Sequence, residues 1–256
     1  MKHILEVGAR TVDDVLAAEK GGADQAELYS SPLEGALSPS AGLIKSAVEA
    51  AGPLKLMVMI RPRAGDFLYS ANEFKTMQRD VEIAVEAGAD GIMCGILTAD
   101  GRLDRKRMED MVRRVGDRQV TLHRAFDFAR DPLCTLEEAI DCGCDRILTI
   151  GQQQEATFDR KTLLRILARA SERIKIMLGL GADFDTRTEL EAIVRETGAN
   201  EYHIVNGYRT RASRMEWNGG QTIHRDDYLK KDMFSLSCLS EEAVREARNL
   251  LDKLDE

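Results

Sequence analysis

Residues 86–97 read Glu-Ala-Gly-Ala-Asp-Gly-Ile-Met-Cys-Gly-Ile-Leu, and this stretch predicts how the chain folds. Gly88 suits the end of a helix, the Ala-Asp pair turns the chain, and the apolar run after it is typical of a buried strand. The phrase has three further copies, which are Gly22-Ala23-Asp24, Gly143-Cys144-Asp145 and Gly198-Ala199-Asn200. The copies lie roughly 60 residues apart, about the length of two strand–helix units. The phrase therefore predicts where the second, fourth, sixth and eighth strands begin.

Short apolar runs alternate with helical patterns on both sides of each copy. The predicted strands are Ile4–Ala9, Gln25–Ser30, Leu54–Arg61, Gly91–Leu97, Gln119–Phe126, Arg146–Gly151, Lys175–Gly181 and Tyr202–Asn206. The predicted helices are Val12–Lys20, Ala41–Ala51, Glu73–Ala87, Arg105–Val115, Leu133–Asp141, Phe158–Ser171, Arg187–Thr197 and a last one that Ser240 caps. Evenly recurring units favour a closed barrel over an open doubly wound sheet, which has one switch point. The sequence predicts an α/β protein with one domain over residues 1–256, a single (β/α)8 TIM-type barrel.

One long stretch, residues 207–239, shows neither pattern. It carries several arginines, the single tryptophan of the chain and a Gly-Gly pair. More than about 15 structureless residues inside a compact domain are usually functional or interfacial. We interpret this stretch as a loop between the eighth strand and the eighth helix that acts as a lid or a subunit contact.

The composition excludes several classes of protein. The chain has 256 residues, of which 43% are hydrophobic and 31% charged, so it has enough apolar side chains for a core. The net charge of −8 disfavours a general nucleic-acid binder. The apolar runs are far shorter than the ~20 residues of a membrane span, and no signal-peptide core follows the N-terminus. We therefore expect neither nucleic acid nor a membrane as a partner, and a cytoplasmic location.

Polar residues stand at the ends of several predicted strands, where barrels of this type carry their active sites. A charged side chain in an apolar strand must be paired, because its burial otherwise costs several kcal/mol, roughly. Arginine can clamp an anion, whereas glutamate or histidine can transfer protons. We predict a catalytic set consisting of Glu6, Glu27, Arg61, His123 and Asp127. The predicted substrate-binding set consists of Arg63, Asp66, Arg124, Gly181, His203 and Asn206.

Each of these residues also has a structural interpretation. The acids and arginines can neutralise one another in a closed network, and Gly181 suits any tight turn as well as a phosphate loop. Arg124 alternates with His123 in the predicted fifth strand, so it can pair behind the sheet instead of facing the site. The five cysteines are an odd number, which argues against a disulfide scaffold. No histidine and cysteine set has zinc spacing, so we predict no metal site.

Two blocks of sequence are distinctive: Ile60-Arg61-Pro62-Arg63-Ala64-Gly65-Asp66-Phe67-Leu68-Tyr69 and His123-Arg124-Ala125-Phe126-Asp127. With these blocks, and with Glu6 and Glu27 in their strands, the chain resembles the CutC family from about residue 5 to the Asp227-Tyr228 region. The resemblance implies a TIM barrel with a role in copper homeostasis. It also implies a cytoplasmic homo-oligomer, for which a dimer is favoured. Cu(I) is implied only by the family's name, and the residues identify no cofactor.

The chain departs from the pattern that the resemblance implies. Many members carry a cysteine soon after the first-strand glutamate and another after the second-strand Glu-Leu pair, whereas this sequence has Val7-Gly8 and Leu28-Tyr29 there. A copper site that depends on those thiols would lose its ligands in this chain. Cys142-Gly143-Cys144 can bind a soft ion but is more typical of buried thiols at a helix–strand turn.

Three functions remain open from the sequence. The first is a CutC-like barrel that handles copper ions. The second is a lyase, aldolase or isomerase acting on a small anionic metabolite, a phosphate or a carboxylate, with His123 and the glutamates moving protons. The third is a barrel without catalytic activity whose polar residues are fully paired.

Overall fold

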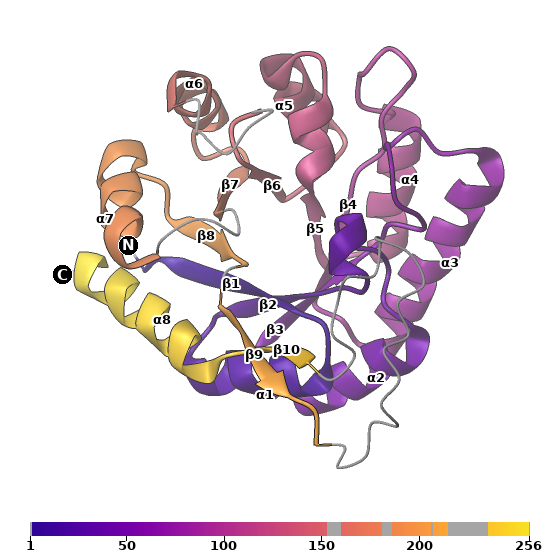
Figure 1. The fold of residues 1–256 in the computed structure, drawn as a ribbon. Coiled ribbons are helices and arrows are strands. Elements are labelled where there is room, and N and C mark those ends of the chain that lie inside the picture. Colours follow the sequence, from indigo (N-terminus) through magenta and orange to yellow (C-terminus); the bar gives the residue numbers. More distant parts are fainter. Residues whose placement is uncertain (1, 153–159, 181–185, 206, 215–234, 256) are drawn as a thin grey trace.

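The computed structural model describes residues 2–152, 160–180, 186–205, 207–214 and 235–255. Eight parallel strands form a closed barrel in sequence order, and helices surround it (Figure 1). The barrel strands are β1 (Ile4–Ala9), β2 (Gln25–Leu28), β3 (Lys55–Met59), β4 (Gly91–Cys94), β5 (Gln119–Leu122), β6 (Arg146–Thr149), β7 (Lys175–Leu180) and β8 (Glu201–Ile204). The α-helices are α1 (Val12–Gly21), α2 (Ala41–Ala50), α3 (Ala71–Ala87), α4 (Arg105–Val115), α5 (Pro132–Asp141), α6 (Arg160–Ala170), α7 (Thr186–Thr197) and α8 (Glu241–Asp255). The predicted (β/α)8 barrel is confirmed.

The aspartate of the recurring phrase links two neighbouring strands, and we call this link an aspartate closure. In three of its copies the aspartate exchanges two hydrogen bonds with one residue of the preceding odd-numbered strand. Its backbone N–H donates to that residue's carbonyl, and its carboxylate accepts that residue's N–H. The pairs are Asp24 with Leu5, Asp90 with Leu56 and Asp145 with Val120, and their carboxylate bonds measure 2.9, 2.8 and 2.8 Å. The acid therefore fixes the register between each pair of strands.

Side chains from alternate strands fill the barrel in layers, as expected for this architecture. The strand register and the alternation of side chains place the residues that follow the phrase in one layer near the N-terminal end of the barrel, which consists of Gln25, Gly91, Arg146 and Glu201. Above them lie Glu6, Met57, Thr121 and Met177, and then Glu27, Met93, Leu148 and His203. The next layer, at the C-terminal mouth, holds Gly8, Met59, His123 and Gly179. The interior is therefore unusually polar.

The fifth strand differs from its prediction. It ends at Leu122, and residues 124–128 form a 3-10 helix, η2 (Arg124–Phe128), for which His123 is the N-cap. The Nδ1 atom of His123 accepts the backbone N–H of Ala125 at 3.2 Å, which turns the chain before Phe126. The strand alternation used for Arg124 was therefore wrong.

The stretch 207–239 is not wholly irregular. Its ends, β9 (Tyr208–Ala212) and β10 (Ser235–Leu239), form an antiparallel pair that lies over α1 in Figure 1. Asp14 holds this pair because its carboxylate accepts the N–H of Leu239 at 2.8 Å. In the described parts of the chain, no helix combines the length and the apolar character that crossing a bilayer requires.

Candidate functional site

Three predicted site residues meet inside the barrel. His203 of β8 lies between two glutamates, with its Nδ1 2.6 Å from Oε1 of Glu6 and its Nε2 3.4 Å from Oε2 of Glu27. Gln25 donates a hydrogen bond to the other oxygen of Glu6. All four side chains are buried. The strands that carry the three charged groups, β8, β1 and β2, are neighbours, which explains why residues far apart in the sequence converge.

The three charged groups shift one another's pKa values. Burial raises the pKa of Glu27 to about 7, against the lowering effect of His203 and with a further rise from Glu6. Burial also acts to raise the pKa of Glu6, but the hydrogen bond and charge of His203, with Arg146, hold it below its ordinary value. Burial acts to lower the pKa of His203, yet both carboxylates raise it. Glu27 is therefore the carboxyl group that can change its protonation near neutral pH.

A second buried pair, Arg146 and Glu201, was not among the predicted site residues. The Nε of Arg146 donates to a carboxylate oxygen of Glu201, and both residues are 5% exposed. Each follows a copy of the recurring phrase as the first residue of a buried strand. Opposite charges at these matching positions are the signal that could have identified the pair. The Arg146–Glu201 pair lies in the layer beneath Glu6.

His123 stands at the mouth with a free hydrogen-bond donor. Burial lowers the pKa of His123 to about 3, and the charge of Arg61 lowers it further, so the imidazole is neutral. Because Nδ1 accepts the N–H of Ala125, the ring proton sits on Nε2. This buried Nε2 has no hydrogen-bond partner among the described residues. The Phe67 ring lies against the imidazole, with 5.2 Å between their centroids.

Gly95 fixes the position of this imidazole, which leads to a first prediction. A Cβ at residue 95 would lie 2.6 Å from Cβ of Ala125 and 2.7 Å from Nδ1 of His123. We expect Gly95→Ala to displace the ring and to lower the free energy of unfolding by about 1–3 kcal/mol. Urea denaturation and the NMR resonances of the His123 ring measure both effects. Gly42→Ala is the control, because nothing lies within 4 Å of its Cβ, and equal behaviour of the two variants would contradict the prediction.

Arg61 and Arg63 hold loops at the mouth. The Nη1 of Arg61 donates to the carbonyls of Glu34, Gly35 and Ala36 at 2.7–3.2 Å, and its Nη2 donates to Gly65 at 2.7 Å. Arg63 donates to carboxylates and carbonyls of residues 64–73. These contacts favour a positioning role for both arginines, so catalysis by Arg61 and substrate binding by Arg63 remain predictions.

Asp127 and Asp66 also bind neighbouring backbone. The Asp127 carboxylate accepts the hydroxyl of Thr149 and the N–H groups of Ile150 and Gln152, and burial raises its pKa against these bonds. Asp66 accepts from Arg63 and from the N–H of Leu68. The roles predicted for both residues remain predictions. Gly181 and Asn206 lie outside the described residues.

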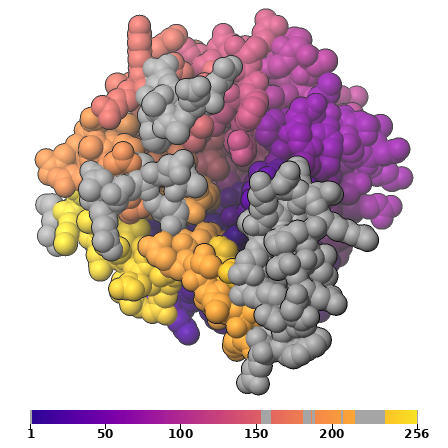
Figure 2. Space-filling view, in the orientation of Figure 1, coloured from indigo at the N-terminus to yellow at the C-terminus, as the bar shows by residue number. Residues whose placement is uncertain are grey.

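Arg124 faces the mouth and not the back of the sheet, which corrects the expectation from strand alternation. Its Nη1 lies 3.4 Å from where a Cβ of Gly35 would be, and its guanidinium carbon lies 5.7 Å from the ring centroid of Phe128. The side chain is exposed. Unlike Arg61 and Arg63, it is available to bind an anion. In the space-filling view, the surface beside the β9–β10 pair is hollowed (Figure 2).

Fold and site together define a (β/α)8 barrel with titratable groups in its interior and an exposed arginine at its C-terminal mouth, which is the usual place for small-molecule chemistry in this class. The chain belongs to the CutC family, whose family model matches residues 3–208. It is 40% identical to family protein CutC of Bacteroides thetaiotaomicron over 89% of this chain and 92% of that protein. It is 41% identical to family protein CutC of Parabacteroides distasonis over 79% of this chain and 82% of that protein.

A solved structure gives the same assignment. The Streptococcus agalactiae protein named copper homeostasis protein CutC superposes with a TM-score of 0.74 and 28% sequence identity. The match covers 78% of this chain and 97% of that one. The family predicted from the sequence is therefore confirmed.

Proposed function

We propose that this CutC-family barrel binds a small anionic carbonyl compound at its C-terminal mouth and transfers a proton to or from the carbon beside the carbonyl. The observation that carries the proposal is the buried Nε2–H of His123, a neutral donor without a partner among the described residues. Buried donors are almost always paired, so an unpaired one at a barrel mouth points to a ligand oxygen. A neutral imidazole can polarise a carbonyl by donating a hydrogen bond to it while the proton stays on the ring.

Two further groups complete the proposed chemistry. Glu27, with a pKa of about 7, is suited to take up a proton and return it at neutral pH. Arg124 is placed to hold a carboxylate or phosphate of the same molecule, since a guanidinium binds both with two parallel hydrogen bonds. Glu6 and His203 would position Glu27 and set its charge. We also propose that the protein is cytoplasmic and forms a homodimer, as expected from the sequence.

The experiment is deuterium exchange into a panel of 2-oxo acids and carbonyl phosphates, followed by proton NMR. We expect exchange with at least one compound, a loss of about 10²–10⁴-fold in Glu27→Gln, and a large loss in His123→Ala. Arg124→Ala is expected to weaken binding, whereas Arg165→Ala, on the exposed side of α6, is the control that leaves both unchanged.

Copper handling is the second candidate function, in keeping with the name of the S. agalactiae protein. The observation that favours it is a buried cluster inside the barrel that contains Met57, Met59, Met93 and Met177, because thioethers suit Cu(I). The thiols fit less well, since burial raises the pKa of Cys94 to about 12 and that of Cys142 to about 11. Within the described ranges, no group of three or more His, Cys, Asp or Glu side chains is arranged to hold a metal ion.

Thermal-shift measurements with Cu(I) and with the metabolite panel, run in parallel, separate the two candidates. A shift that copper alone produces, and that persists in His123→Ala, would reject the enzymatic proposal. Loss of that shift in Met59→Leu together with Met93→Leu would assign copper to the thioether cluster.

A further inference from the structure

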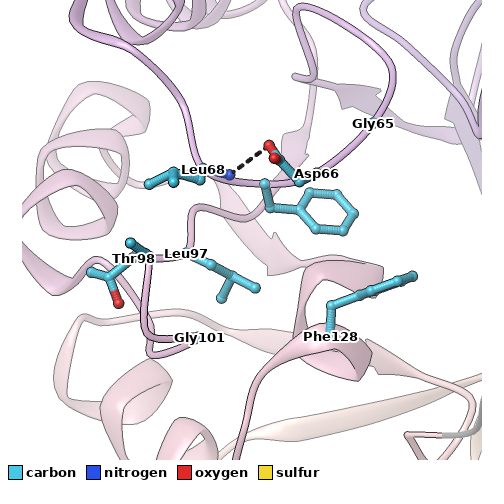
Figure 3. Close-up of a pocket in the computed structure, with 9 residues that line it drawn as sticks. Gly65, Asp66, Leu68, Leu97, Thr98, Gly101 and Phe128 are labelled. Atoms are coloured by element: carbon cyan, nitrogen blue, oxygen red, sulfur yellow. Dashed lines mark hydrogen bonds between the residues drawn. The ribbon is translucent and has the colours of Figure 1, made fainter.

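A pocket of about 440 Å³ opens beside the proposed site. It lies between the loop after β3 and the loop after β4, and Phe128 at the end of η2 closes it (Figure 3). Its apolar walls are Phe67, Leu68, Leu97 and Phe128. Pockets of this size with mostly apolar walls are typical of small-molecule sites.

Two of the four apolar walls, Leu68 and Phe128, are exposed, and the loop that carries Leu68 is held in place. Leu68 is 46% exposed and Phe128 is 61% exposed, which is unusual for large apolar side chains on neighbouring loops. The carboxylate of Asp66 accepts the N–H of Leu68 at 3.1 Å and a donor of Arg63 at 2.9 Å, and it thereby fixes the first loop. Among the described residues that line the pocket, Asp66 alone carries a carboxylate, and this group is thus engaged with the protein itself.

Aromatic contacts connect this pocket to the proposed catalytic groups. The Phe67 ring lies 5.4 Å from the Phe128 ring on one side and 5.2 Å from the His123 ring on the other, measured between centroids. The guanidinium of Arg124 lies 5.7 Å from the Phe128 ring centroid. A ligand that places an apolar group against Phe128 would therefore have Arg124 near its acid group, and Phe67 would connect the pocket to His123.

We propose that this pocket binds the aromatic side chain of the substrate, which makes the substrate class an aromatic 2-oxo acid. This inference rests on the proposed function and narrows it. A sugar phosphate would set hydroxyl groups against Phe67, Leu68, Leu97 and Phe128 and leave them without hydrogen bonds, at an energetic cost. An aromatic ring instead removes the two exposed side chains from water and stacks on Phe128.

The test compares phenylpyruvate with pyruvate by isothermal titration calorimetry of the full chain. We expect phenylpyruvate to bind at least about tenfold more tightly, because burial of its ring adds apolar contact. Leu68→Ala and Phe128→Ala are expected to reduce this preference to about threefold or less. Both residues are exposed, so the fold should tolerate the changes. Leu164→Ala on α6, which removes an equally exposed leucine elsewhere, is the control and should keep the full preference.

The outcomes separate this inference from the proposed function. Equal affinity of the two acids in the unchanged protein would overturn the aromatic pocket and leave the proposed function standing. Failure of both acids to bind would count against the proposed function as well. If Leu68→Ala and Phe128→Ala leave the preference unchanged and instead dissociate an oligomer in sedimentation velocity, the surface is a subunit contact and the inference is wrong.

Discussion

Arg146→Met is expected to lower the free energy of unfolding by about 3–5 kcal/mol, because it leaves the buried carboxylate of Glu201 without its cation. Both residues are only 5% exposed, so little water can take the place of the lost partner. Arg146 also helps to lower the pKa of Glu6, so the charge balance of the layer above should change as well. Urea denaturation at pH 7, followed by circular dichroism, measures the effect.

Two controls separate burial from simple loss of an ion pair. Arg169→Met breaks the exposed contact with Glu137 and should cost less than about 1 kcal/mol. Changing Glu201→Leu together with Arg146→Met removes both buried charges and should restore most of the lost stability. If Arg146→Met costs no more than Arg169→Met, the buried pair does not stabilise the barrel as inferred.

Glu27→Gln is expected to make the protein more stable at pH 8 and to have little effect at pH 5. The folded protein holds the pKa of Glu27 at about 7, above its ordinary value of 4.5. A raised pKa in the folded state contributes stability that is present below pH 4.5 and is lost as the pH rises through about 7. The difference between the two pKa values corresponds to about 3 kcal/mol. Glutamine resembles the protonated acid and stays neutral at every pH, so the variant does not lose stability as the pH rises.

The measurement is urea denaturation of both proteins at pH 5 and pH 8. The variant should exceed the unchanged protein by up to about 3 kcal/mol at pH 8 only. Glu172→Gln, which alters an exposed carboxylate, is the control and should change the free energy of unfolding by less than about 0.5 kcal/mol. A constant difference at both pH values would contradict the shifted pKa of Glu27. The same Glu27→Gln variant is expected to lose the proposed proton transfer. The carboxyl group of Glu27 therefore lowers stability at pH 8 but is needed for the proposed reaction.

The fold was predictable because the recurring phrase has a local physical cause. The aspartates at 24, 90 and 145 bind the preceding strand, and the residue after each phrase enters the same interior layer. The meeting of Glu6 with His203 follows from barrel closure, which makes the first and last strands neighbours. Alternation of side chains along a strand then points both residues inward.

Other features depend on contacts that sequence patterns do not contain. The fifth strand stops at Leu122 because a ring nitrogen of His123 captures a backbone N–H, and no apolar periodicity records that bond. Arg61 turned out to donate to loop carbonyls, which depends on a loop conformation that the residue types alone do not specify. Arg146 and Glu201 are 55 residues apart, so only the closed barrel reveals that they pair.

The aspartate closures also define the smallest part of this barrel that can be exchanged. Each closure joins an odd-numbered strand to the even-numbered strand that follows, so the β1–β2, β3–β4 and β5–β6 pairs each carry their own link. A chimera between relatives that is spliced after an even-numbered strand takes both partners of each aspartate closure from the same parent. A splice between an odd-numbered strand and the next even-numbered strand would pair the aspartate of one parent with the backbone of the other.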